Sequence, residues 1–262
     1  MTGRFSAWRA VWLLLGGCYF LVPLVATAEF SLRAGGGRYD LSAYAFVLRD
    51  PRFLESFRLS LVLALETIAV ALVLLLPTVY WVHLRLARLR PLVEFVSVLP
   101  FVVPPIVLVV GLLNLYRGAP ELLVGSPHFL VTGYVILALP YVYRALDAGL
   151  RAIDVHTLTE AAQSLGAGWL TTMARVILPN LQGAVLSGAF LTLAIVMGEF
   201  TLANVMLFST FSVYINYIGE TQATPAAALT LASFAVTWVA MAGILVVGRQ
   251  LGGRQAQIGG AR

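Results

Sequence analysis

The stretch AVWLLLGGCYFLVPLVATA, residues 10–28, carries no charged side chain. A helix needs about 20 predominantly apolar residues to cross the hydrocarbon core of a membrane, so this stretch is long enough to span one. Arg4 and Arg9 precede it, and residues 26–28 (Ala-Thr-Ala) resemble the cleavage site of a secretory signal peptide. Because further apolar stretches follow, we interpret residues 10–28 as an uncleaved first membrane span.

Five more stretches have the same character. Residues 59–82 are interrupted only by Glu66, and residues 92–116 only by Glu94. The other three are residues 122–143, 180–198 and 225–248. Residues 200–219 are also uncharged, but Thr, Ser and Asn side chains dilute them and make insertion marginal. The sequence therefore predicts an all-α integral membrane protein with about six transmembrane helices, organised as a single transmembrane domain over residues 1–262.

The composition supports this class and excludes others. Of the 262 residues 60% are hydrophobic and only 11% charged, with a mean hydropathy of +0.90, whereas a soluble domain carries about a quarter charged residues. The lone Cys18 provides neither a disulfide framework nor a thiolate metal site, and the three histidines lie far apart in the sequence. No basic cluster is longer than Arg85, Arg88 and Arg90, so nucleic acid is a poor partner.

The arginines predict the orientation of the chain. With six spans and the N-terminus inside, the cytoplasmic segments hold 11 arginines and three acids, and the outer segments hold six arginines and seven acids. This asymmetry follows the positive-inside rule and places both termini in the cytoplasm. A seventh span at residues 200–219 would instead export Arg249, Arg254 and Arg262. The Gly-rich loop between Glu29 and Arg58 is then external.

Residues 144–178 form a cytoplasmic loop of mixed polarity between the fourth and fifth spans. Thr157 and Glu160 have the spacing of a capping box, which predicts that a short helix begins at Thr157. Gly166 is suited to end this helix, and a second amphipathic segment, residues 169–178, leads to the fifth span. A helix this short is not stable alone, so we expect a docking surface, with a plain connecting loop as the alternative.

Part of this loop resembles a known signature. Glu160-Ala161-Ala162, Gly166 and Val176-Ile177-Leu178-Pro179 follow the E-A-A-x-x-x-G-x9-I-x-L-P pattern of type I permease subunits in binding-protein-dependent ABC importers, with valine where isoleucine is usual. The resemblance implies that the short helix is a coupling helix, which docks on an ATPase through Glu160, Ala161, Ala162, Leu165 and Gly166. The chain has no Walker-type phosphate-binding loop and no lysine, so it needs no cofactor of its own and ATP would be hydrolysed by partner subunits.

The same resemblance implies the other partners. They are a dimer of ABC ATPase subunits, a second homologous but non-identical permease subunit, a periplasmic or lipid-anchored substrate-binding protein, and the lipid of a bacterial inner membrane. Three further segments, residues 99–107, 143–150 and 198–200, resemble permeases for polyamines, ferric iron, thiamine and phosphonates. We expect a small hydrophilic solute, with a polyamine such as spermidine or putrescine as the first choice and the other cargoes as alternatives.

Four residues are candidates for the translocation path. Placing the charged Glu66 side chain inside a bilayer costs free energy, which makes it a functional candidate. Glu199 lies at the outer end of the fifth span, where an ordinary interfacial acid is the alternative. Pro104 and Pro105 break backbone hydrogen bonding within the third span, which favours a bend beside a pore or a kink for packing alone. An intramembrane enzyme using Glu66, Glu94 or His128 is the rival hypothesis, although these residues have no recognisable partners in the sequence.

Overall fold

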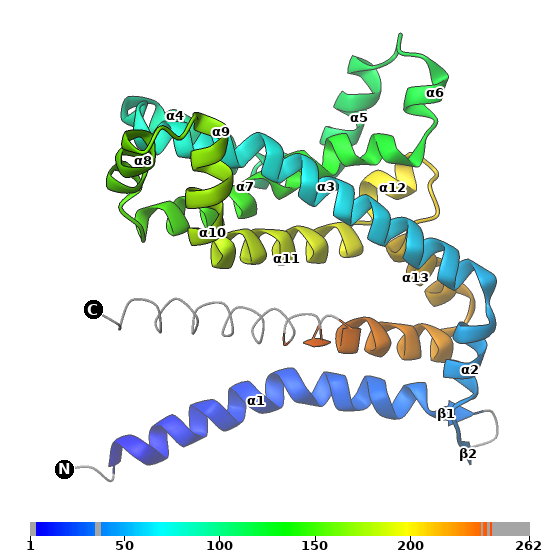
Figure 1. The fold of residues 1–262 in the computed structure, drawn as a ribbon. Helices are drawn as coiled ribbons and strands as arrows, with labels where there is room; N and C mark the ends of the chain where they lie inside the picture. The colour runs from blue at the N-terminus through cyan, green and yellow to red at the C-terminus, as the bar shows by residue number, and fades with distance from the viewer. Residues whose placement is uncertain (1–3, 35–37, 237, 240–241, 243–262) are drawn as a thin grey trace. The chain divides into compact units, whose positions relative to one another are not determined.

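The computed structural model describes residues 4–34, 38–236, 238–239 and 242 (Figure 1). They form two compact units, which are described separately: the first is drawn from residues 1–55 and 214–238, and the second from residues 56–213 and 239–262. Almost all described residues are helical. The predicted all-α fold class is therefore correct.

The first unit begins with the long helix α1, Arg4–Ser31. A two-residue hairpin follows, in which β1 (Arg33–Ala34) pairs with antiparallel β2 (Arg38–Tyr39). The short helix α2 covers Ser42–Arg49. The unit also contains the first turn of α3, the end of α13 and the apolar helix Ala223–Val236.

The second unit contains most of α3 (Pro51–Leu84) and the beginning of α13 (Phe211–Thr221). Between them lie η1 (Ala87–Leu89), α4 (Arg90–Val98), η2 (Leu99–Phe101), α5 (Pro105–Leu115), α6 (Glu121–Val124), η3 (Pro127–Phe129), α7 (Leu130–Arg151), α8 (Val155–Ser164), α9 (Trp169–Thr172), the π-helical turn η4 (Met173–Ile177), α10 (Leu178–Asn180), α11 (Gln182–Gly198) and α12 (Thr201–Val205). Figure 1 shows α4, α8 and α9 at one end of this unit, and α5, α6 and α12 at the other.

Three described helices are long and apolar enough to cross a membrane: Trp8–Ser31, Pro51–Leu84 and Pro127–Arg151. They contain the predicted first and second spans and most of the fourth. The third and fifth predicted spans each correspond to a bent pair of helices, which raises the number of spans to as many as five. The sixth, residues 225–248, begins in the apolar helix Ala223–Val236, and most of its remainder lies outside the described residues, as does the arginine-bearing tail.

The helix in the region of the predicted fourth span is displaced along the chain from the expected residues 122–143. α7 runs from Leu130 to Arg151, so the loop between α7 and α8 begins at residue 152, whereas the sequence indicated a loop from residue 144. The charged residues Arg144, Asp147 and Arg151 lower the local hydropathy, so the predicted span ends at residue 143. The helix nevertheless continues through this stretch. Two arginines, Arg90 and Arg151, and a hydrogen bond to His83 Nε2 offset the cost of burying the Asp147 carboxylate.

The third span is not one helix. α4 with η2 and α5 meet at an angle of 104° around Pro104. Pro104 has the extended ψ of 140° that a residue before proline favours, and neither Pro104 nor Pro105 offers an N–H to continue the helical ladder. The prolines thus produce a complete break rather than a modest kink.

Two clusters of buried apolar residues hold the second unit together. One joins α3, α7, α8 and η4 and includes Tyr80, Leu146, Val155 and Ile177. The other joins α3, α5, α7, α11 and α12 and includes Leu63, Tyr134 and Leu202. The first cluster therefore connects the expected cytoplasmic loop directly to two membrane helices.

Candidate functional site

The helix expected in the cytoplasmic loop is present, but it begins earlier than predicted. α8 starts at Val155, and its N-cap is Asp154, whose carboxylate accepts hydrogen bonds from the Thr157 amide (3.1 Å) and hydroxyl (2.7 Å). Thr157 is therefore inside the first turn and is not the N-cap of a capping box. An aspartate caps at least as well as threonine, and it also benefits from the positive end of the helix dipole.

The same hydrogen bonds hold the pKa of Asp154 below its ordinary value. A carboxyl group with a lowered pKa contributes stability above its unfolded pKa and loses that contribution as the pH falls through its folded pKa. The cap is therefore intact at neutral pH and weakens only in acid.

The end of α8 matches the prediction. Gly166 has φ +81°, the left-handed conformation that favours glycine. Its amide donates to the carbonyl of Gln163 (2.9 Å), and the Ala167 amide donates to the carbonyl of Ala162 (3.0 Å). These two bonds form a Schellman motif, which ends the helix and turns the chain sharply.

α8 presents one face to the protein and one to solvent. Val155, Thr159 and Ala162 are buried, and the Thr159 hydroxyl lies 3.0 Å from the hydroxyl of Tyr80 in α3. Ala162, predicted to be a docking residue, is only 7% exposed, so its methyl group packs inward. The other predicted docking residues, Glu160, Ala161, Leu165 and Gly166, are exposed.

The tip of the loop carries an exposed apolar group. Leu165, the C-cap of α8, is 89% exposed, and Leu170 in α9 is 71% exposed. An apolar side chain on a polar loop gains nothing from contact with water, so a partner surface is its natural environment. Single exposed apolar residues also occur without function. What distinguishes Leu165 is that the Schellman motif beside it fixes its position at the end of α8.

The second amphipathic segment is more irregular than predicted. In place of one helix over residues 169–178, α9 passes into the π-helical turn η4 and then into α10, and the chain bends by 79° before α11. Met173 and Ile177 of η4 are buried in the cluster that contains Val155. The fifth span begins at Gln182, two residues after the predicted Asn180.

A pocket of about 460 Å³ lies beside the break in the third span. It is lined by Pro100, Phe101, Pro105, Leu137, Tyr141, Ala194, Ile195, Gly198, Glu199, Phe200 and Thr201. The rings of Phe101 and Tyr141 pack edge to face at 5.3 Å. Two of the predicted path residues, Pro105 and Glu199, thus line one cavity, while Pro104 sits at the break itself and Glu66 is not among the lining residues.

Glu199 has a structural role that the sequence did not indicate. Its side chain is buried, and both carboxylate oxygens accept from the Leu202 amide in the first turn of α12, at 3.0 and 3.1 Å. Its carbonyl accepts a hydrogen bond from the Ser212 hydroxyl. The residue therefore fixes the turn after α11 while it lines the pocket.

Glu66 and Glu94 each have a partner. The Glu66 carboxylate lies 2.8 Å from Nδ1 of His128, and Glu94 lies 3.6 Å from the guanidinium of Arg144 rather than pairing with Arg90. The expectation that Glu66 and His128 lack partners was therefore wrong. A single partly exposed acid–imidazole pair does not, however, contain the nucleophile, base and oxyanion groups of a hydrolytic site.

An ionic cluster around the buried Asp147 lies near the C-terminal end of α7, and the sequence pattern did not predict it. One oxygen of Asp147 accepts from His83 Nε2 (2.7 Å) and from Arg90 (2.8 Å), and the other accepts from Arg151 (2.6 Å). The spacing of Asp147 and Arg151 by four residues signals the helical pair. Nothing in the sequence brings His83 and Arg90 to the same carboxylate, because they lie 64 and 57 residues away.

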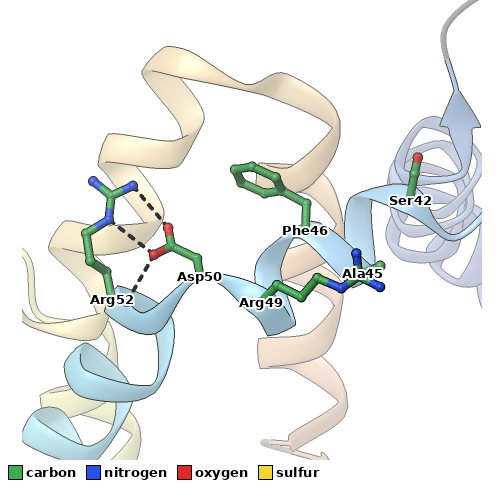
Figure 2. A pocket seen from close by; sticks show the side chains of 6 residues that line it. All are labelled: Ser42, Ala45, Phe46, Arg49, Asp50 and Arg52. Atoms are coloured by element: carbon green, nitrogen blue, oxygen red, sulfur yellow. Dashed lines mark hydrogen bonds and ion pairs between the residues drawn. The ribbon is translucent and has the colours of Figure 1, made fainter.

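The first unit has a pocket of about 470 Å³, lined by Ser42, Ala45, Phe46, Arg49, Asp50 and Arg52 (Figure 2). Figure 2 shows Arg52 joined to Asp50, and the Tyr214 hydroxyl also donates to Asp50 at 3.2 Å. The Arg52 guanidinium stacks 4.9 Å from the ring centroid of Tyr217. These contacts tie α2 and the start of α3 to α13.

The fold defines an all-α integral membrane protein whose broken helices surround a cavity and whose polar loop packs on two spans. Residues 83–252 match the family described as the binding-protein-dependent transport system inner membrane component, and the chain belongs to this family. It is a permease subunit of an ABC importer with the type I fold and is not an enzyme. Permeases of this family work with an ATPase and a substrate-binding protein.

Solved structures agree on the fold. A chain from the "crystal structure of a bacterial ABC transporter involved in the import of the acidic polysaccharide alginate" has a TM-score of 0.71 and 18% identity, with 94% of this chain and 98% of that chain covered. A chain from the inward-facing MetNI methionine ABC transporter has a TM-score of 0.60 and 17% identity, with 76% and 95% covered. No curated protein sequence matches this chain.

Proposed function

We propose that this chain forms half of the translocation pathway of an ATP-driven importer in a bacterial inner membrane. It has a single permease domain with both termini in the cytoplasm, and a second, non-identical permease subunit completes the path. A dimer of ABC ATPase subunits binds the α8 loop and hydrolyses ATP, so this chain requires no cofactor. A periplasmic or lipid-anchored binding protein delivers the solute.

The observation that carries this proposal is the way α8 is built. Its inner face is anchored to α3 through the Tyr80–Thr159 contact and through the cluster around Val155, while its outer face exposes Glu160, Ala161 and Leu165. A rigidly anchored helix with an exposed apolar tip can transmit movement of a bound partner to the spans. A plain connecting loop would need neither feature.

Replacing Leu165 with aspartate tests the docking surface. Because the side chain is almost fully exposed, the change should leave the fold intact but place a charge where an apolar contact with the ATPase is expected. We expect co-purification of the ATPase subunits to fall by tenfold or more, which corresponds to about 1.4 kcal/mol or more. The measurement is the amount of ATPase retained per permease after affinity purification in mild detergent.

Leu122, in α6, provides the matched control. It is 92% exposed, and the predicted topology puts it on the outer side, so Leu122→Asp introduces the same charge far from the ATPase. The two variants should accumulate in the membrane equally. Retention of the ATPase by Leu165→Asp at the parent level would remove the docking assignment.

For the cargo, we propose a small cation, with a polyamine as the first choice. The pocket beside the α4–α5 break is lined by the aromatic residues Phe101 and Tyr141 and by the acidic Glu199, a combination that favours cations. None of its lining residues, within the part of the chain that the structure describes, is basic. Ferric iron, thiamine and phosphonate remain the alternatives, and an anionic phosphonate fits this lining least well.

Uptake of labelled spermidine by cells carrying Glu199→Gln tests this assignment. Glutamine keeps an oxygen to accept from the Leu202 amide, so α12 should remain capped while the negative charge is lost. We expect uptake to fall roughly tenfold, equivalent to about 1.4 kcal/mol. Glu66→Gln removes the same charge away from this pocket and should have a smaller effect. Equal effects of the two changes, or none from Glu199→Gln, would exclude this pocket as a cation site.

A further inference from the structure

We infer that Asp147 is a positioning residue that locks α3 and α4 to the helix leading into α8, so that movement of the docked loop reaches the broken third span. This inference rests on the proposed docking of the ATPase at α8. It assigns a role in transport to an ionic cluster that contacts neither the pocket nor the exposed surface of the loop.

Asp147 and its partners lie at the ends of helices near the docking loop. Asp147 lies one turn before the end of α7, and only residues 152–154 separate α7 from α8. Its partner His83 is the penultimate residue of α3, and Arg90 is the first residue of α4. One carboxylate thus joins the ends of three helices at the point where the chain enters the docking loop.

The two oxygens of the carboxylate have different functions. Oδ1 accepts from His83 and from Arg90, so both of its bonds cross between elements. Oδ2 accepts from Arg151, four residues further along the same helix, and that bond ties α7 only to itself. The cluster therefore contains two bonds that could transmit movement and one internal bond that serves as a built-in comparison.

Losing either bond between helices should cost free energy. Asp147 is 7% exposed, and removing one partner from a buried ion pair is costly because the remaining charge is left uncompensated. Between membrane helices, apolar packing gains little over contact with lipid, so close packing and hydrogen bonds decide which helices move together. Glu94 and Arg144 also join α4 to α7, but at 3.6 Å and with exposed side chains, which makes their bond weak.

The bonds from Asp147 to His83 and Arg90 connect the docking loop to the pocket wall through α4. α4 leads through η2 to the 104° break, and Pro100, Phe101 and Pro105 around that break line the pocket. If α4 moves with α7 and α8, then displacement of the loop reshapes the pocket wall. If the bonds from Asp147 to α3 and α4 are lost, the ATPase can still bind and hydrolyse ATP. The pocket wall then no longer moves with the loop.

The experiment compares six single substitutions in the complete importer, purified with its ATPase and reconstituted in lipid; the sixth, Asp147→Glu, is a conservative rescue variant. Asp147→Asn removes the negative charge that both bonds between helices share, and His83→Gln and Arg90→Gln each replace one of its two partners in another helix. Arg151→Gln removes only the internal bond, and Arg144→Gln removes only the exposed pair. For each variant we would measure the ATPase retained, the rate of ATP hydrolysis, and the solute transported per ATP.

We expect the three link-breaking variants to retain the ATPase and hydrolyse ATP while transport per ATP falls by at least about fivefold, the lower end of typical coupling between sites. Arg151→Gln and Arg144→Gln should stay close to the parent. Asp147→Glu, which keeps the carboxylate, should recover part of the loss. If Asp147→Asn proves too unstable to purify, His83→Gln and Arg90→Gln carry the same test.

A second readout does not depend on the cargo. Spin labels at exposed positions His156 in α8 and Leu92 in α4, in a Cys18→Ser background, report the distance between the two helices. In the parent the distribution should stay narrow when ATP and vanadate trap the complex, whereas in Arg90→Gln it should shift or broaden.

Two results would overturn the inference: a parent-like distance and transport ratio in Asp147→Asn and Arg90→Gln, or equal losses in Arg151→Gln and Arg90→Gln, which would show that only local charge compensation matters. Absence of any ATPase from the parent complex would instead contradict the proposed function, and this inference with it. Normal assembly with unchanged coupling contradicts this inference alone.

Discussion

Replacing Gly166 with valine should release the ATPase from the complex, while the same change at Gly168 should not. Gly166 has φ +81°, which costs a residue with a side chain about 1–2 kcal/mol, and a β-branched residue is the least tolerant. The Schellman bonds to Gln163 and Ala162 depend on that conformation. Without them α8 would lose its fixed end, and the exposed Leu165 beside it would lose its position.

Gly168 is a matched control because it lies in the same loop and has equal room for a side chain but lacks the positive φ. A Cβ built on either glycine meets no atom within 4 Å, so neither substitution creates a clash. Gly168, however, has φ −72°, which any residue adopts. Co-purified ATPase and ATP hydrolysis in the membrane report the difference. Similar losses in both variants would mean that side-chain volume, rather than backbone conformation, disturbs the loop.

Gly149→Val should disrupt the packing of α7 on α11 and lower the thermal stability of the purified protein. A Cβ at Gly149 would lie 2.5 Å from the Cβ of Ala184, which is closer than real Cβ contacts, and in tight contact at 3.1 Å with a methyl group of Leu181. Overpacking of this kind costs about 1–3 kcal/mol. Close approach through small residues is a principal source of helix association in membranes, so the loss should also reduce the folded yield.

Gly183, next to Ala184 in α11, allows the same substitution without a clash. A Cβ there meets no atom within 4 Å, so Gly183→Val tests the effect of a β-branched residue in the same helix pair. The measurement is the temperature at which the detergent-solubilised protein loses its monodisperse elution peak. Melting temperatures that fall equally for the two variants would argue against direct helix contact at Gly149.

The apolar stretches were sufficient to predict the class of protein, and most of the residues expected to span the membrane are helical. Residues 10–28 and 59–82 lie within α1 and α3, and α11 begins two residues after the expected start of the fifth span. Hydropathy predicts such helices because lipid sets a simple condition. A backbone that spans the membrane must satisfy its hydrogen bonds internally, and it must do so over an apolar segment of fixed length. Length and hydropathy, both properties of a continuous segment, express that condition directly.

Local conformational signals were also readable. Gly166 ends α8 as its chemistry predicts, and the proline-rich segment breaks the third span. The sequence did not indicate the size of that break or which residue is the N-cap of α8. Asp154 and Thr157 are both good N-cap residues, and only the observed hydrogen bonds distinguish Asp154 as the cap.

The tertiary structure alone decided which polar groups meet. Hydropathy ended the fourth span before Asp147, yet α7 continues through it, and His83 and Arg90, distant in sequence, meet that carboxylate. Likewise, Ala162 is buried although its neighbour Ala161 is exposed, because the face that α8 presents depends on where Tyr80 and Val155 pack. The cost of burying a charge or a methyl group depends on its surroundings in space, and one sequence without its contacts does not specify those surroundings.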